Sequence, residues 1–171
     1  SLLSNYPEPA LPDAIRAATA DADPLVRLSV ARAADSLPLD ARAQIVGRLL
    51  LDPIRAVRIE AARSLAAADP AQLGAHLARA RGPALEEYRQ SQRLDADRPN
   101  SHVNLALLAS SMGRFAEAKA HYRQALEVGP YFLPAYANLA DLLRREGRDP
   151  ESEGLLRRAL EIEPDSADIH H

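Results

Sequence analysis

The histidines are the residues of this chain best suited to acid–base or metal chemistry, since it contains no cysteine. His76 and His121 have no companion at ligand spacing, and His170 and His171 are adjacent, which would send them to different faces of a helix. The chain also lacks a glycine-rich phosphate loop, a Gly-x-Ser-x-Gly turn and a His-Glu-x-x-His helix. The sequence therefore predicts a protein that is not an enzyme and holds no cofactor or metal.

Composition excludes further classes of function. The 171 residues are 47% hydrophobic, 26% charged and only 4% aromatic, which suits helices that pack through small side chains. A net charge of -3 with no clustered basic face argues against a nucleic-acid partner. The longest apolar stretch, around residues 45–51, is interrupted by Arg48 and is far shorter than the roughly 20 apolar residues of a membrane span. We therefore expect a soluble protein without a membrane span.

The carboxy-terminal half contains two segments that match each other at an offset of 34 residues. The matching pairs include Asn104 with Asn138, Gly113 with Gly147, Ala125 with Ala159, and Pro130 with Pro164. A unit with this period is a helical hairpin that cannot bury its apolar face alone. Stacked hairpins share one core and leave a concave surface free for a partner, so the repeat predicts a binding scaffold.

This half resembles the tetratricopeptide repeat, with units at residues 99–132 and 133–166 and a truncated third unit from residue 167. The residues that carry the resemblance in the first unit are His102, Leu105, Ala106, Ala109, Gly113, Ala118, Tyr122, Ala125 and Pro130. Those in the second are Tyr136, Leu139, Ala140, Leu143, Gly147, Ser152, Leu156, Ala159 and Pro164. The resemblance implies that the small residues let two helices approach closely and that each glycine ends a helix in the left-handed conformation.

A second repeat, at an offset of 31, lies in the amino-terminal half. Its matching pairs include Asp21 with Asp52 and Val26-Arg27 with Val57-Arg58. Asp23-Pro24 and Asp52-Pro53 predict helix starts, because Asp accepts from free amides and Pro has no donor to leave unpaired. Residues 13–68 resemble the short bacterial HEAT-like repeat, whose mark is an Asp-Pro-x-x-Val-Arg stretch. The resemblance implies that Arg27 and Arg58 form a structural ladder of ion pairs between neighbouring units.

The remaining segments complete the predicted organisation. Residues 1–12 are a linker or the end of a preceding element, and residues 69–98 are an adaptor with helices over 71–80 and 84–94, separated at Gly82-Pro83. The expected fold class is all-α, a right-handed α–α superhelix of about ten or eleven helices in which HEAT-like repeats run into tetratricopeptide repeats.

The tetratricopeptide resemblance also implies the binding residues, because the first helices of such units line the concave groove. The inward positions are Asn100, Val103, Asn104, Leu107, Asn138, Asp141, Arg144 and Arg145. Asn104 and Asn138 occupy the place where relatives grip a peptide backbone with an amide, which both donates and accepts. Relatives that clamp a terminal carboxylate need Lys and a second Asn where this chain has Val103 and Leu107. An apolar or mixed peptide is therefore expected.

Two functions follow as hypotheses. The first is a non-enzymatic scaffold that holds a peptide or protein segment in the concave groove. The second is a structural spacer for a catalytic or electron-transfer domain elsewhere in a longer protein. The second rests on a resemblance of the whole arrangement to the carboxy-terminal portion of bacterial multihaem cytochrome proteins, although no haem-binding residue is present. The compartment stays open between cytoplasm and periplasm, and only this resemblance favours the periplasm.

The chain starts at Ser1 and stops where another repeat would begin, so the sequence predicts an excised piece of a longer protein. An array of repeats needs a polar capping helix over its last apolar face. We therefore expect Leu139, Leu142 and Leu143 to be partly uncovered, and the fragment to self-associate through this carboxy-terminal face.

Overall fold

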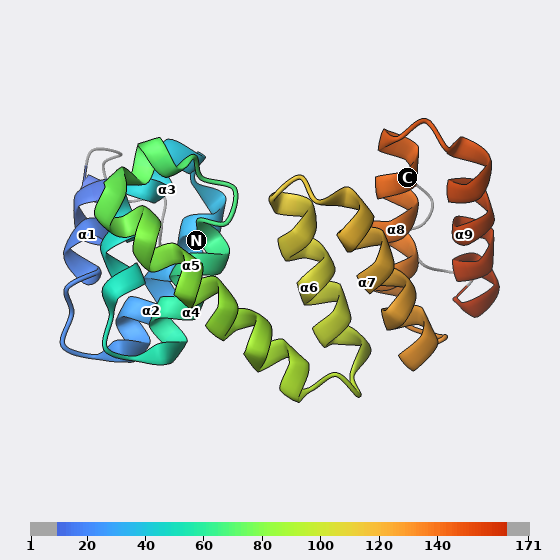
Figure 1. The fold of residues 1–171 in the computed structure, drawn as a ribbon, viewed down its shortest axis with the longest axis horizontal. Helices are drawn as coiled ribbons and strands as arrows, with labels where there is room; N and C mark the ends of the chain where they lie inside the picture. The colour runs from blue at the N-terminus through green and yellow to red at the C-terminus, as the bar shows by residue number, and fades with distance from the viewer. Residues whose placement is uncertain (1–9, 164–171) are drawn as a thin grey trace. The chain divides into compact units, whose positions relative to one another are not determined.

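The part of the chain that the structure describes is built from helices. The computed structural model describes residues 10–163, with side chains from residue 14 onward, and divides the chain into two compact units, Ser1–Arg89 and Gln90–His171 (Figure 1). No strand occurs between residues 10 and 163, so the predicted all-α fold class is confirmed. Over the same residues, no helix is long and apolar enough to cross a membrane.

The first unit contains α1 (Ala10–Ala18), α2 (Pro24–Ala33), α3 (Leu39–Val46) and α4 (Arg55–Ser64), with short 3-10 helices at Ala34–Ser36 and Gly47–Leu51. Both ends of α4 lie 31 residues after the corresponding ends of α2, so the sequence period sets the helix boundaries. Asp23 caps α2 as predicted, accepting from the Leu25 amide at 2.8 Å. The predicted start at Asp52-Pro53 is wrong, because α4 begins at Arg55 with Ile54 as its N-cap. The Asp52 carboxylate instead accepts from the Ile54 amide at 2.9 Å, in the turn before the helix.

The helix α5 (Pro70–Leu94) differs from the expected adaptor. Its backbone departs from helical geometry at Gly74, with φ 72° and ψ 158°, and then continues through Pro83 without the predicted break. Proline removes one hydrogen bond from a helix and leaves the carbonyl four residues earlier without a donor. Arg79 and Pro83 are both exposed, so water can solvate that carbonyl and the helix persists. The two units divide within this helix, after Arg89.

Ion pairs join successive elements of the first unit. Arg27 contacts Asp52 through two bonds, Nε to Oδ2 at 2.6 Å and Nη2 to Oδ1 at 3.1 Å. Arg58, at the equivalent place one period later, contacts both carboxylate oxygens of Glu87 on α5 at 2.8–3.2 Å. Each arginine also donates to two backbone carbonyls, which fixes its planar head. The structure thus gives both arginines the predicted structural role, while the HEAT-like relationship itself stays a prediction.

The second unit consists of two helical hairpins. Its helices are α6 (Pro99–Ser111), α7 (Phe115–Val128), α8 (Leu133–Arg145) and α9 (Asp149–Ile162), and every boundary in the second hairpin lies 34 residues after its counterpart. Gly113 and Gly147 have φ of 72° and 74°, as the predicted helix ends require. After each glycine the next amide, of Arg114 or Arg148, donates back to the last turn of the helix at 2.9 Å.

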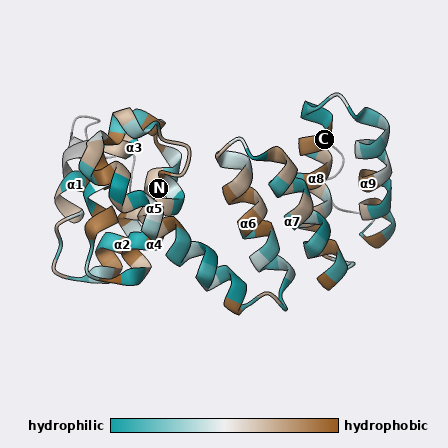
Figure 2. Cartoon of the chain, viewed as in Figure 1, coloured by the Kyte–Doolittle hydropathy of each residue, from teal (hydrophilic) through white to brown (hydrophobic). Residues whose placement is uncertain are grey.

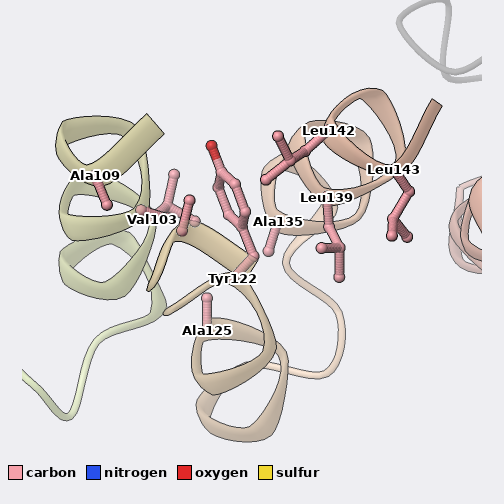
Figure 3. Close-up of a cluster of buried hydrophobic side chains, with 10 residues drawn as sticks. Val103, Ala109, Tyr122, Ala125, Ala135, Leu139, Leu142 and Leu143 are labelled. Atoms are coloured by element: carbon pink, nitrogen blue, oxygen red, sulfur yellow. The ribbon is translucent and has the colours of Figure 1, made fainter. Parts of the chain in front are cut away.

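The small side chains of the repeat are fully buried in this unit. Ala106, Ala118 and Ala125 are each 0% exposed. Every helix of this unit carries apolar and polar residues along its length (Figure 2). The buried apolar residues form two clusters, a small one with Tyr136 and Ala159 and a larger one that includes the ring of Tyr122. Figure 3 shows this ring between Val103 of α6 and the side chains of α8.

The expected exposure of Leu139, Leu142 and Leu143 is wrong. These side chains are 3%, 4% and 2% exposed, because both α7 and α9 pack against α8. The predicted self-association through this face therefore loses the apolar surface on which it was based. The third unit expected from residue 167 lies outside the described residues, as do Pro164, His170, His171 and most of the predicted linker over residues 1–12.

Candidate functional site

The candidate binding surface is formed by the first helices of the two hairpins. The helices α6 and α8 contact each other, while α7 and α9 follow as the second helices of their hairpins (Figure 1). The predicted site residues all lie on these two helices. Those on α6 are Asn100, Val103, Asn104 and Leu107, and those on α8 are Asn138, Asp141, Arg144 and Arg145. The repeat therefore brings together residues that are more than 30 positions apart in the sequence.

On α6 the structure separates the predicted residues into buried and available ones. Val103 is only 6% exposed and belongs to the larger apolar cluster. The prediction that it lines the groove is therefore wrong, and it packs beneath the surface as a core residue. Leu107, one turn later, is 47% exposed and offers apolar area. Asn100 is exposed, and the Asn104 amide Nδ2 donates to Gln92 Oε1 at 2.9 Å, which holds that side chain against α5.

On α8 the predicted polar residues form one charged group. The Asp141 carboxylate contacts Arg144 Nη2 at 3.1 Å and Arg145 Nη2 at 2.7 Å. Both arginine side chains remain widely exposed, at 60% and 69%, whereas Asp141 is 38% exposed. Asn138 Nδ2 donates to the Pro134 carbonyl at 2.6 Å, one turn earlier in the same helix. One carboxylate shared by two guanidinium groups leaves a net positive charge on this part of the surface.

Tyr122 belongs to this site as well, and the sequence reasoning assigned it to packing alone. Its side chain is 2% exposed, and burial, with the negative charge of Asp141, raises the pKa of its hydroxyl to about 12. Arg145 opposes this effect, so the hydroxyl lies within electrostatic reach of both charged residues on α8. The charge pattern of α8 in the sequence gave no signal for this proximity, because it depends on how α7 packs against α8.

A second set of charges lies along α7 and the turn before α9. Lys119 Nζ donates to both oxygens of Glu146 at 2.7 and 2.6 Å, and this hydrogen bond lowers the pKa of that carboxyl against an opposing effect of burial. Arg148 pairs in turn with Glu151 through two bonds of 2.6 Å each. The Lys119–Glu146 pair connects the two hairpins, whereas the Arg148–Glu151 pair lies within the second hairpin. Both are separate from the group around Asp141.

The histidines of the described chain make structural contacts. His102 Nε2 donates to the Ala96 carbonyl at 2.9 Å, which ties α6 to the preceding loop. Its ring centroid lies 6.3 Å from that of His121, whose Nδ1 contacts Gln124 Oε1 at 3.0 Å. His76 is exposed on α5. Between residues 10 and 163, no three His, Cys, Asp or Glu side chains are grouped so that they could hold a metal ion.

The chemistry that remains is recognition. An exposed apolar side chain, amide oxygens and a guanidinium pair can contact a polypeptide through apolar burial, hydrogen bonds and charge. Asn104 and Asn138 use their NH2 groups within the chain, so each can still accept a hydrogen bond at Oδ1. The site can therefore hold a ligand by several modest contacts of different kinds.

Comparison with known proteins agrees with this geometry. A family model described as "Tetratricopeptide repeat" matches residues 109–171, from the last turn of α6 onward, which is less than half of the chain. No curated protein matches the sequence. Tetratricopeptide repeats generally serve as protein-interaction modules. The match, the helical hairpins and their 34-residue offset together support a tetratricopeptide repeat in the second unit.

Proposed function

We propose that this protein is a non-enzymatic scaffold whose second unit binds a segment of another protein on the surface of α6 and α8. The observation that carries the proposal is the exposure of Leu107 on α6 and of the guanidinium groups of Arg144 and Arg145 on α8, since these two helices contact each other. Leu107 offers apolar area that a partner can bury, and arginine is favoured at protein interfaces.

Each part of the surface has a defined role in this proposal. Leu107 buries apolar area against the partner, and Asn138 accepts from a backbone amide through Oδ1. The arginine pair attracts acidic side chains, because Asp141 neutralises only one of the two positive charges. That attraction weakens with salt, since the Debye length is about 8 Å at physiological ionic strength. An extended or helical segment with apolar and acidic residues fits best.

The proposal is tested by a comparison of captured proteins. The protein and its Asn138→Ala variant serve as baits in parallel, with an Arg157→Ala variant as the control, because Arg157 lies on α9 and pairs with Glu153 at 2.6 Å. Partners held by the proposed surface are retained by the control and reduced by Asn138→Ala. Titration of a purified partner then measures the loss, which we expect to be about 0.5–1.5 kcal/mol. Equal affinity for all three proteins would place the binding site elsewhere.

A structural spacer is the second candidate, and a specific observation favours it. Many polar groups of the chain already have partners inside it, as in the contacts of Arg27 with Asp52 and of Asn104 with Gln92. A spacer needs rigid joints of this kind and no partner on α6 and α8. Under this alternative the Asn138→Ala variant leaves every captured protein unchanged, whereas Arg27→Ala loosens the first unit and increases its proteolysis.

A further inference from the structure

An apolar cavity of about 350 Å³ opens between α7, α8 and α9. Four leucines line it, namely Leu126, Leu139, Leu143 and Leu155. Its volume lies at the lower end of the range of about 300–1,000 Å³ that ligand pockets usually have. Leu139 and Leu143 are one turn apart and lie on a different face of α8 from Asn138 and Asp141. The cavity is therefore separate from the surface proposed above.

Gly154 also lines this cavity. It lies in the middle of α9, where glycine destabilises a helix relative to alanine. Its φ is not in the left-handed region, and a Cβ built on it meets no atom within 4 Å. Neither backbone conformation nor close packing therefore requires glycine here. The first hairpin carries Ala120 at the equivalent position, which shows that the repeat accepts a side chain there.

The cavity is also specific to the second hairpin. Two of the four cavity leucines are replaced by polar residues 34 positions earlier in the sequence. Gln92 is equivalent to Leu126, and His121 is equivalent to Leu155. Both polar residues are engaged in contacts of their own, with Asn104 and Gln124 respectively. The apolar lining is thus a feature of this sequence at one place rather than of the repeat in general.

One cation and one carboxylate line the cavity beside the leucines. Arg123 is exposed there, and its charge reaches Glu146, whose pKa is lowered mainly by Lys119 and further by Arg148 and Arg123. Glu151 also lines the cavity and is bound by Arg148, while Glu146 is bound by Lys119. These three cations face two carboxylates. One positive charge is therefore left in excess beside an apolar cavity, which is complementary to a ligand that combines an apolar group with a carboxylate.

We propose that this cavity is a second docking site, which takes one large apolar side chain from an acidic segment of a partner protein. The apolar side chain fills the space beside Gly154, and a neighbouring carboxylate of the segment pairs with Arg123. A shallow, open cavity of this size suits a side chain presented by a peptide, because the peptide backbone stays in water at the mouth.

The test uses a short acetylated and amidated peptide with one leucine flanked by glutamates, added to the full chain. Binding is followed by NMR of the leucine methyl groups. We expect a Kd below about 1 mM, with shifts at the four cavity leucines. Gly154→Leu fills the cavity and should weaken binding at least about tenfold, by loss of one buried apolar side chain. Arg123→Gln should weaken it about two- to fivefold and remove most of its salt dependence.

Two variants separate binding from folding. Gly154→Ala should raise the Tm by about 2–4 °C, since alanine is the better helix former. The same variant should still lower the affinity for the peptide. Ala120→Leu places the same leucine at the equivalent exposed position of α7 and should leave binding unchanged. A variant that gains stability while it loses affinity cannot have lost the ligand through unfolding.

Several results would overturn the proposal. They are the absence of binding at about 2 mM peptide, an unchanged affinity in Gly154→Leu, and methyl shifts confined to Leu107 on α6. Cavity shifts that depend on protein concentration alone would make a second copy of this chain the occupant, and the proposal would be wrong. Because the proposed surface on α6 and α8 is tested through Asn138, either site can fail while the other stands.

Discussion

Replacement of Ala125 by leucine tests the packing of the two hairpins. Ala125 is 0% exposed in the same cluster as Tyr122, Ala135 and Leu139, so the larger side chain has no free space to enter. Overpacking of this kind typically costs about 1–3 kcal/mol. In a chain of this size each kcal/mol lowers the Tm by about 2–4 °C, so we expect a fall of about 2–12 °C.

The assay is thermal unfolding followed by circular dichroism, with hydrogen exchange to assign the lost protection to α6–α9. Ala120→Leu is the matched control, because it adds the same atoms on the exposed side of α7. Surface substitutions usually change stability by less than about 0.5 kcal/mol, so the Tm of the control should stay near that of the parent. If Ala125→Leu were as stable as the control, the hairpins would not approach each other at this residue and the assignment of α6 and α8 to one surface would fail.

Three further changes have defined outcomes. Gly129→Ala would place a Cβ 2.8 Å from Pro99 Cγ, a rigid ring, and should destabilise the second unit by about 1–3 kcal/mol in chemical unfolding. Burial opposes ionisation of Asp52, but its hydrogen bonds with Arg27 and a backbone amide prevail and lower the pKa of its carboxyl. The ionised carboxylate therefore stabilises the fold fully above about pH 4, the usual Asp pKa, and this stabilisation is lost as the pH falls through the lowered pKa. Asp52→Asn should remove this loss from the pH profile of stability. Absorbance titration should find the ionisation of Tyr122 near pH 12, because burial raises its pKa to about 12, and a normal value near 10 would mean that its hydroxyl is solvated.

The sequence predicted the features that depend on local periodicity. Equal spacing of Gly113 and Gly147 fixed the ends of α6 and α8, because a left-handed glycine ends a helix wherever the repeat places it. The alanines of the repeat likewise predicted where helices approach, since only small side chains fit there. The HEAT-like resemblance assigned Arg27 and Arg58 to structure, and in the structure each forms an ion pair with a carboxylate.

Features that depend on packing between helices could not be predicted. Val103 and Leu107 are both apolar and lie one turn apart in the sequence, yet only Leu107 is exposed. Val103 is buried because it packs in the same cluster as Tyr122. The helix α5 continues through Pro83 at a place where both Pro83 and Arg79, four residues earlier, are exposed. Gly154 carried a usable signal, because glycine weakens the interior of a helix and an isolated one is unexpected there. Only the packing of α7 and α8 against α9 shows the cavity that it lines.

The central claim is that α6 and α8 form a binding surface, and substitution of Leu107 tests it most directly. Leu107→Asp places a charge in the proposed contact, and the fold tolerates aspartate there because Asp141 occupies the equivalent position of α8. The measurement is calorimetric titration of a captured partner against the parent, Leu107→Asp and the control Arg157→Ala. The account predicts a loss of about tenfold or more for Leu107→Asp alone, from the apolar area that no longer becomes buried. Equal affinities for all three proteins, with the helical content unchanged, would contradict it.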